Sequence, residues 1–353
     1  MSVTKQILII GAGLSGLMAA TVLRQKAYQR QAVDRQITII DKGRSVGGRL
    51  ATRRIGDGTE IGRADHGAQF FTVRTREFHH YVTYWRKIGL VYEWSQGWAN
   101  QLGDGSAGEV VLDGYPRYAI KDGMNELARH LAVELQEHNV AIHTGTQIQS
   151  IHVTEANQWV ATATNGSTYE AEMLIMTPPV PQTLTLLAEG NVMLASDDHQ
   201  ALARIQYAPC LCGLFHVDGE VNLPEPGALQ TPGQTITWIA DNQRKGISPN
   251  IRTITVHAGA DYSRRYYDAD DAVALAGLQD ALTPLLSPDT TLVESQLKRW
   301  RYSQPEVSHP KRYLQAQRLP PLFIGGDAFG GPRVEGAALS GMAIGQTIRK
   351  VLS

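Results

Sequence analysis

The fold of this chain is decided near its amino terminus by Ile7–Leu23, ILIIGAGLSGLMAATVL. Residues 6–10 are the short apolar run typical of a strand buried on both faces. From residue 15 to about residue 24, apolar side chains recur at helical spacing. A strand, a glycine-rich turn and a helix in this order predict the first half of a βαβ unit.

Three glycines in the turn match the pattern G-x-G-x-x-G of dinucleotide-binding folds. Gly11 permits a tight turn, Gly13 lets the backbone approach a pyrophosphate, and Gly16 allows the helix to pack closely on the strand. The amide groups at the start of the helix, including that of Ser15, would then face the phosphate charge. The pattern alone also occurs in ordinary glycine-rich turns, so its weight depends on the neighbouring segments.

The next strand, ITIID, ends on Asp41, 25 residues after Gly16. An acid at this place accepts hydrogen bonds from an adenosine ribose and repels a 2′-phosphate. The pattern therefore favours FAD or NAD as the bound dinucleotide, with a solvated turn aspartate as the alternative. The crossover between the two strands, residues 25–36, is polar and longer than usual.

The composition indicates a globular protein that acts on small molecules. The chain has 353 residues and a formal net charge of −1, so it lacks the basic excess that non-specific nucleic-acid binding requires. Cys210 and Cys212 are predicted to be buried thiols, not a disulfide or a zinc site, as expected in a reducing cytoplasm. We predict a cytoplasmic protein with no metal and no membrane partner, and we expect its apolar amino-terminal segment to be retained.

Gly47-Gly48-Arg49 comes soon after the acid-terminated strand. Together with the glycine pattern and the strand-end acid, it resembles the FAD-binding fold of the glutathione-reductase type, in the branch that holds amine oxidases, phytoene desaturases and renalases. The resemblance implies that Arg49 contacts the FAD phosphates or nearby backbone. It also implies that the bound cofactor is a flavin.

A second hallmark of that family lies near the carboxyl terminus. Residues 322–327, LFIGGD, form an apolar strand ending in Gly-Asp, and the resemblance places the Asp327 carboxylate on a ribityl hydroxyl of the flavin. Residues 334–341, VEGAALSG, resemble the helix whose N-terminus faces the flavin pyrimidine edge. Ile148 resembles the residue whose backbone pairs with adenine, and it also fits an ordinary strand core position.

The resemblance thus assigns non-covalent FAD binding to a set of residues from both ends of the chain. Residues 332–334, PRV, lack the cysteine that carries covalent flavin in other members. The full set of implied cofactor residues is Gly11, Gly13, Ser15, Gly16, Asp41, Lys42, Gly48, Arg49, Gly67, Ala68, Gln69, Ile148, Gly326, Asp327, Glu335, Gly336 and Ala337.

Two further segments resemble the renalases and their bacterial relatives. Residues 65–72, DHGAQFFT, are similar to their D-x-G-A-Q segment, and residues 299–303, RWRYS, are similar to their W-x-Y-S element. This resemblance implies oxidation of the 2- and 6-dihydro isomers of NAD(P), by hydride transfer to flavin N5 and reoxidation by dioxygen to hydrogen peroxide. The implied partners are a nicotinamide dinucleotide and dioxygen; the isomer and the choice of NAD or NADP stay open.

Other functions remain as alternatives. A flavin amine oxidase acting on small amines is the first, although residues 329–332, FGGP, lack the Trp or Tyr that classical amine oxidases place there as one of a pair around the flavin. A flavin-free dinucleotide-binding regulatory protein is the second, and the Gly-Asp strand with its terminal helix argues against it. A carotenoid- or porphyrinogen-type desaturase would need an apolar channel that the sequence does not indicate.

For the substrate face, three residues are expected to act in catalysis. Asn242 lies in a segment, WIADNQRKG, that resembles the family's segment with a polar residue near the flavin. His257 would hydrogen-bond the substrate, and Trp300 would form a wall of the pocket. Each also has a structural interpretation: a turn asparagine, a core histidine and a core tryptophan.

The predicted fold class is α/β, a Rossmann-like FAD-binding domain with an inserted α+β substrate lobe on a mixed or antiparallel sheet. The expected FAD-binding domain is discontinuous and takes in residues 1–75, 115–180 and 296–353. The expected substrate-binding lobe takes in residues 76–114 and 181–295. Residues 98–114 are rich in Gly, Asp and Asn, which suggests an exposed hairpin or loop at a lobe boundary.

Overall fold

The computed structural model forms two compact units, each built from separate stretches of the chain. It describes residues 5–25, 35–57, 60–101, 107–231 and 233–352. Unit 1 comprises Met1–Gly48, Leu127–Gln206 and Pro305–Ser353, and unit 2 comprises Arg49–Glu126 and Tyr207–Gln304.

Unit 1 is built on a six-stranded sheet in the order β17-β18-β11-β1-β2-β7. The strands from β18 to β7 run parallel, and β17 pairs antiparallel at one edge. Ile9 at the centre lies opposite both Ile39 and Ile175, and all three are fully buried, as the apolar runs predicted. The strands are β1 (Lys5–Ile10), β2 (Arg35–Ile40), β7 (Ala141–His143), β11 (Met173–Met176), β17 (Leu314–Gln315) and β18 (Leu322–Ile324).

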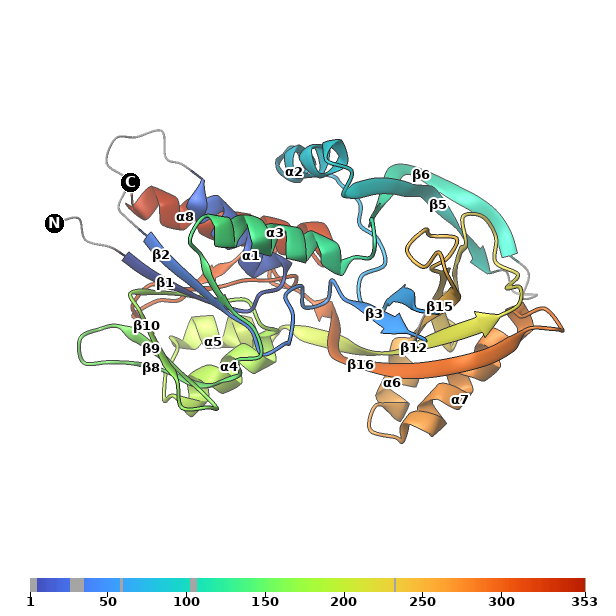
Figure 1. Ribbon diagram of the computed structural model, residues 1–353. Helices are drawn as coiled ribbons and strands as arrows, with labels where there is room; N and C mark the ends of the chain where they lie inside the picture. Colours follow the sequence, from blue (N-terminus) through green and yellow to red (C-terminus); the bar gives the residue numbers. More distant parts are fainter. Residues whose placement is uncertain (1–4, 26–34, 58–59, 102–106, 232, 353) are drawn as a thin grey trace. The chain divides into compact units, whose positions relative to one another are not determined.

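Helices cover one face of this sheet. α1 (Leu14–Arg24), α3 (Asn125–Glu137) and α8 (Arg333–Leu352) lie together on that face, where α1 and α8 pack closely (Figure 1). A three-stranded antiparallel sheet of β8 (Ile148–Val153), β9 (Trp159–Ala163) and β10 (Thr168–Ala171) lies on the other side. α4 (Val180–Glu189) and α5 (Ser196–Ala203) complete the unit.

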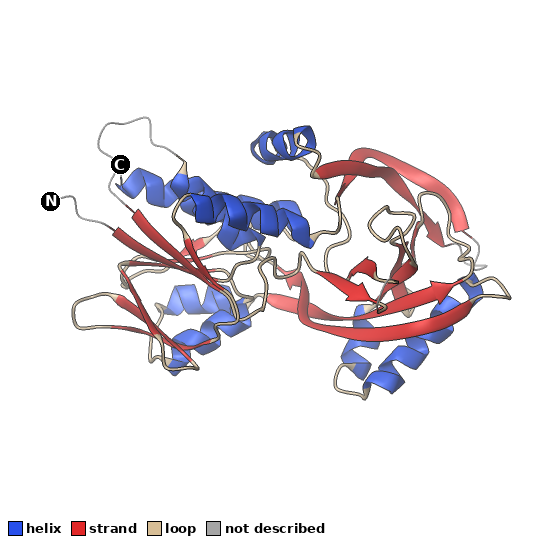
Figure 2. Cartoon of the chain, viewed as in Figure 1, coloured by secondary structure: helices blue, strands red, loops and turns tan. Residues whose placement is uncertain are grey.

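Unit 2 is dominated by strands (Figure 2). Its seven-stranded sheet has the order β16-β12-β15-β14-β13-β5-β6 and is mixed, because β13 pairs parallel with β5 and antiparallel with β14. The strands are β5 (Val91–Gln101), β6 (Ala107–Ile120), β12 (Gln206–Asp218), β13 (Ala228–Gln230), β14 (Ile236–Asp241), β15 (Arg252–Ala258) and β16 (Thr291–Val307). A hairpin of β3 (Thr52–Ile55) and β4 (Gly62–Asp65), the helices α2 (Arg76–Lys87), α6 (Ala260–Tyr266) and α7 (Asp271–Leu282), and the short 3₁₀ helix η1 (Thr283–Leu285) complete it.

The two faces of the seven-stranded sheet carry different side chains, because successive residues of a strand alternate between faces. One face is aliphatic: Ile239 and Val256 pack there with Leu278 of α7. The other carries Trp98 and Trp238. We call this second side the aromatic face.

This architecture confirms the expected α/β class, with a Rossmann-like sheet and a second lobe on a mixed sheet. The unit boundaries differ from those expected. Residues 49–75 lie in unit 2, where β4 bonds to the β14–β15 region, and residues 296–304 lie there too because β16 is one continuous strand. Residues 181–206 lie in unit 1 as α4 and α5. Within 98–114, the described residues form the ends of β5 and β6, and residues 102–106 lie outside the described part.

Candidate active site

The glycine-rich turn of unit 1 has the geometry that its three glycines predict. Gly11 has φ of +103°, where other residues are strained, and a Cβ there would lie 2.4 Å from Thr177 Oγ1. A Cβ at Gly16 would lie 2.0 Å from the Gly11 carbonyl oxygen, so only glycine allows α1 to start this close to β1. A Cβ at Gly13 would meet no atom within 4 Å. The turn is thus tightly packed at two glycines and open at the one expected to face a phosphate.

The start of α1 has a buried polar atom without a partner. Gly13 is the N-cap and provides no side-chain hydrogen bond. The Ser15 hydroxyl in the first turn is buried and has no hydrogen-bond partner among the described residues. Free amide groups, an orphaned hydroxyl and the positive end of the helix dipole together fit a phosphate group.

Asp41 joins this turn to the next one. Its carboxylate accepts the Ala12 N–H at 2.7 Å and the Gly43 N–H at 2.6 Å. The Gly47 N–H donates to the Ala12 carbonyl oxygen at 2.9 Å, which brings the Gly47-Gly48 turn against Gly13. A carboxylate has about four acceptor positions, so two bonds leave capacity for a ribose hydroxyl.

The carboxyl-terminal hallmark lies at the same edge of the parallel sheet. Gly326 has φ of +135°, and a Cβ there would lie 3.5 Å from the Thr177 carbonyl oxygen, beside the packed Gly11. Its N–H donates to Ser340 Oγ of α8 at 2.9 Å. The structure therefore brings the two glycine motifs together from opposite ends of the chain, at the carboxyl ends of the strands where α/β folds bind ligands.

The remaining predicted residues of unit 1 have varied surroundings. Lys42 Nζ donates to Gln182 Oε1 at 3.3 Å on the surface, and Ile148 is buried at the start of β8. Asp327 is half-buried, and Glu335, Gly336 and Ala337 lie in the first turns of α8.

In unit 2 the turn Asp65–Gln69 is held by a buried ion pair. Lys245 Nζ lies 2.6 Å from Asp65 Oδ2 and donates to the Gln69 carbonyl oxygen, also at 2.6 Å. Both charged side chains are completely buried. Lys245 therefore joins the two ends of the turn. Burial lowers the pKa of Lys245, and the adjacent Asp65 carboxylate opposes that shift.

Asp65 connects this turn to the surrounding strands. Asp65 Oδ1 accepts hydrogen bonds from Thr52 Oγ1 at 2.5 Å and the Met124 N–H at 2.8 Å. Its carbonyl oxygen accepts hydrogen bonds from Gln69 Nε2 at 2.6 Å and Thr255 Oγ1 at 2.8 Å. The turn is therefore fixed on both its side-chain and its backbone sides.

Two neutral histidines lie beside this turn. Burial lowers the pKa of His66 to about 3 and that of His257 to about 4, so both imidazoles are uncharged at neutral pH. The His66 ring stacks on Trp300 with ring centroids 5.3 Å apart, and Trp300 Nε1 donates to the His66 carbonyl oxygen at 2.7 Å. His257 Nε2 lies 3.5 Å from Gln69 Nε2.

An aromatic cluster continues from the histidines across the aromatic face. Trp238 lies opposite His257 in the strand register, and Phe70, Trp94 and Trp98 pack around it with ring centroids 4.7–6.3 Å apart. This part of unit 2 therefore offers flat rings next to neutral polar groups.

Two predicted residues, Asn242 and Arg49, form hydrogen bonds with other groups of the protein. Asn242 is completely buried, and its amide donates to the Thr253 carbonyl oxygen at 3.0 Å and to Thr255 Oγ1 at 2.9 Å. Both of its N–H groups are thus used within the sheet, where they support the strand pair, and its expected contact with the substrate stays a prediction. Arg49 donates to the carbonyl oxygens of Tyr302 and Ser303, which are nearby backbone groups, as one of its expected roles allowed.

Sequence reasoning missed Lys245 and His66 as site residues. Both lie in segments quoted for the resemblance, yet Lys245 is 180 positions from Asp65 and no spacing rule connects them. The sequence does contain a signal for His66, because this residue lies inside the D-x-G-A-Q segment that resembles the renalases.

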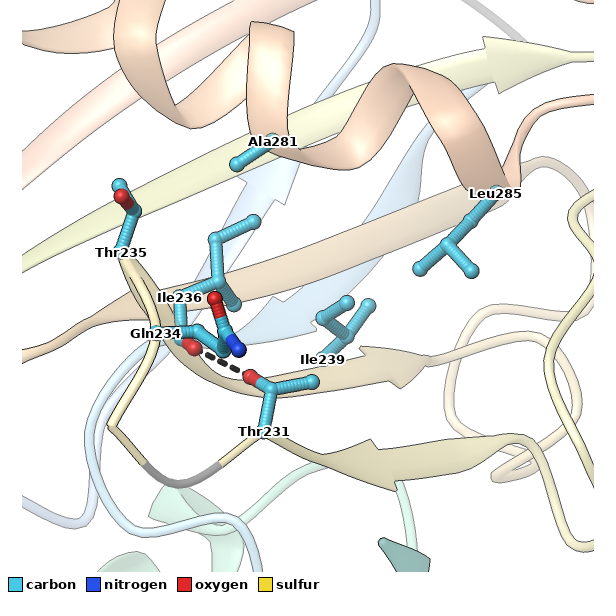
Figure 3. A pocket seen from close by; sticks show the side chains of 7 residues that line it. All are labelled: Thr231, Gln234, Thr235, Ile236, Ile239, Ala281 and Leu285. Carbon is cyan, nitrogen blue, oxygen red and sulfur yellow. Dashed lines mark hydrogen bonds between the residues drawn. The ribbon is translucent and has the colours of Figure 1, made fainter. Parts of the chain in front are cut away.

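Two open cavities of unit 2 lie elsewhere. One, of about 210 Å³, lies on the aliphatic side of the sheet and is lined by Thr231, Gln234, Thr235, Ile236, Ile239, Ala281 and Leu285 (Figure 3). The other, of about 240 Å³, is lined by Arg54, Ile61, Arg63, Ile247, Pro249 and Asn250. No predicted site residue lines either cavity.

Other kinds of site find little support. Within the described part of the chain, no three His, Cys, Asp or Glu side chains gather as metal ligands would. Both cysteines are buried free thiols, as predicted. None of the described helices is both long and apolar enough to cross a membrane.

Similarity to known proteins extends along the chain. Residues 83–348 match the family model of flavin-containing amine oxidoreductases, and residues 9–87 match that of NAD(P)-binding Rossmann-like domains. Mouse (Mus musculus) renalase is 21% identical over 98% of this chain and 99% of its own length.

Solved structures show the same fold at low identity. A protein from Exiguobacterium sp. 255-15 named as a protoporphyrinogen oxidase aligns with a TM-score of 0.70 and 13% identity, over 98% of this chain and 99% of its own. A putrescine oxidase bound to putrescine aligns with a TM-score of 0.69, also at 13% identity, with the same coverage. The chain belongs to the family of flavin-containing amine oxidoreductases and is a flavin-dependent oxidoreductase.

Proposed function

We propose that this enzyme binds FAD non-covalently and oxidises the 2- and 6-dihydro isomers of NAD(P) to the ordinary oxidised nucleotide. The similarity to mouse renalase over nearly the whole chain supports this. A bound flavin would supply the redox chemistry, taking a hydride from the substrate and passing two electrons to dioxygen, which becomes hydrogen peroxide. The glycine turns, Asp41 and the start of α8 in unit 1 would hold the cofactor.

The uncharged character of the aromatic face carries this proposal. A dihydropyridine that loses a hydride becomes an aromatic pyridinium, so the reaction needs no general base; it needs the ring held close and correctly oriented. His66 and His257 are neutral, and the charge of Lys245 is compensated by Asp65. Trp300 and the aromatic cluster provide flat surfaces for a ring, and their apolar area excludes water.

Oxidation of small amines is the second candidate. The aromatic cluster favours it, because rings can surround an ammonium group. However, Lys245 Nζ already lies 4.9 Å from the centroid of the Trp94 ring. The Trp94 ring is therefore already in contact with the protein's own ammonium group and is less available to an amine substrate, which disfavours that substrate class.

Anaerobic reduction of the purified holoenzyme tests the proposal. The visible absorbance of the flavin is followed after addition of 2-dihydro-NAD(P), 6-dihydro-NAD(P), ordinary NADH or putrescine. We expect rapid bleaching by the two isomers and slow or no bleaching by the others. Bleaching by putrescine alone would establish the amine oxidase instead, and a protein that cannot be loaded with FAD would contradict both.

A variant of the aromatic wall gives a matched control. Trp300→Phe keeps a flat ring, whereas Trp300→Leu removes it. We expect the leucine variant to show the larger rise in KM for the dihydro isomers, because the stacking surface is lost. Equal effects of the two variants would argue that Trp300 has only a packing role.

A further inference from the structure

Two buried polar atoms of the Asp65–Gln69 turn lack a hydrogen-bond partner among the described residues. They are His66 Nδ1 and Gln69 Oε1. Gln69 as a whole residue is 6% exposed and its Oε1 is buried, so this oxygen has little access to bulk water. A buried acceptor without a partner costs stability, which makes such an atom a candidate for contact with a ligand.

The Gln69 amide is held in one orientation. Its Nε2 donates to the carbonyl oxygens of Asp65 at 2.6 Å and Gly67 at 3.2 Å, so both N–H groups are committed. Oε1 therefore points away from those two carbonyl groups. Lys245 fixes the backbone of the same residue through its bond to the Gln69 carbonyl oxygen, and Asp65 fixes Lys245.

The His66 ring, three residues earlier in the same turn, is held by Trp300. Trp300 stacks on the ring and also binds the His66 carbonyl oxygen. Since the imidazole is neutral, Nδ1 is either a single donor or a single acceptor, according to the tautomer. A donor at His66 and an acceptor at Gln69 would together match an amide edge, which offers one C=O and one N–H.

We propose that Gln69 Oε1 and His66 Nδ1 bind the amide edge of a planar heteroaromatic ligand, and that the Lys245–Asp65 pair positions them. The ligand group is the carboxamide of the nicotinamide substrate, an assignment that rests on the proposed function. The pyrimidine edge of the flavin has the same C=O and N–H chemistry, and the test separates these two sources.

The test uses two dinucleotides that differ in one hydrogen-bond donor. NAD⁺ carries a carboxamide, whereas 3-acetylpyridine adenine dinucleotide has a methyl group in place of the amide nitrogen. Titration calorimetry of the wild-type holoenzyme should show about 10-fold tighter binding of NAD⁺, the difference expected for one hydrogen bond. Gln69→Leu should abolish this preference and leave the affinity for the acetylpyridine analogue almost unchanged.

His66→Phe is the complementary variant, because it keeps a ring on Trp300 and removes Nδ1. Both dinucleotides retain the C=O group, so this variant should weaken both by a similar factor. The double variant D65N/K245M tests positioning without leaving a buried unpaired charge. It should reduce the preference for NAD⁺ while the Gln69 side chain is still present.

Titration of the apoproteins with FAD distinguishes the two possible ligand groups, the carboxamide of the nicotinamide and the pyrimidine edge of the flavin. If Gln69→Leu weakens FAD binding about 10-fold and does not change the discrimination between dinucleotides, the flavin is the ligand of this amide site. If Gln69→Leu changes neither the affinity for FAD nor the preference for NAD⁺ over the acetylpyridine analogue, the proposal is overturned. Failure of the proposed function has another signature, because there the wild-type flavin would not be bleached by the dihydro isomers.

Discussion

At the scale of single residues, two neighbouring glycines have opposite requirements. Gly13 faces open space at φ of −72°, whereas a Cβ at Gly16 would collide with the Gly11 carbonyl oxygen. We expect Gly13→Ala to leave the stability of the apoprotein nearly unchanged and to weaken FAD binding at least about 10-fold, since the methyl group would fill the position expected for a phosphate. Gly16→Ala should destabilise the fold itself by about 1–3 kcal/mol or more. Thermal unfolding of the apoproteins measures their stability, and titration with FAD measures their affinity for the cofactor. A destabilised Gly13→Ala apoprotein would contradict the different requirements expected at Gly13 and Gly16.

Also at this scale, His66 and His257 link stability to pH. Their folded-state pKa values, about 3 and about 4, lie below the ordinary 6.5, so the unfolded chain binds more protons in mildly acidic solution. Stability should therefore fall as pH falls below about 6.5, by up to about 1.4 kcal/mol per pH unit for each histidine. Urea unfolding between pH 7.5 and 5 measures the slope, and His257→Gln should reduce it by about half. A flat profile in the wild type would show that the two imidazoles are already protonated in the fold.

At the scale of elements, α1 and α8 pack through glycines. A Cβ at Gly341 would lie 2.0 Å from the Ser15 carbonyl oxygen, and one at Gly345 would lie 2.8 Å from that of Ala19. We expect Gly341→Ala to cost at least about 1–3 kcal/mol, because backbone atoms cannot move aside as side chains can. Urea unfolding measures this, with Gly13→Ala as the control for the Gly→Ala exchange. An unchanged stability would mean that the two helices separate at little cost.

The helices and strands also show which parts of the fold can be predicted from the sequence. The strands β1, β2 and β18 and the helices α1, α3 and α8 can be predicted from apolar periodicity and turn residues, which are local signals. The boundaries of the two units cannot be predicted in this way. The strands β6 and β16 both continue beyond the positions at which the amino-acid composition of the chain changes. The ion pair of Lys245 with Asp65 forms only after folding brings together residues 180 positions apart, so no local pattern predicts it.

At the scale of the whole molecule, cofactor binding should appear as added stability. A ligand that binds only the folded state stabilises it by about 2.7 kcal/mol at 100 times its Kd. We therefore expect removal of flavin to lower the Tm, and addition of FAD to restore it in proportion to the logarithm of its concentration. Differential scanning calorimetry measures the Tm. The Gly13→Ala variant is expected to bind FAD poorly, so added FAD should raise its Tm only slightly. A Tm independent of FAD would contradict the expected site.

The packing of α1 on α8 also determines when unit 1 can complete its fold during synthesis. α1 is completed at Arg24, yet the surface against which it packs belongs to α8, whose residues leave the ribosome after both blocks of unit 2. Unit 1 thus has segments before, between and after the two blocks of unit 2. Folding from the amino terminus, one domain after another, is the usual order for a growing chain. The glycine-rich turn and α1 are therefore made early, and one face of α1 stays uncovered until α8 has been synthesised.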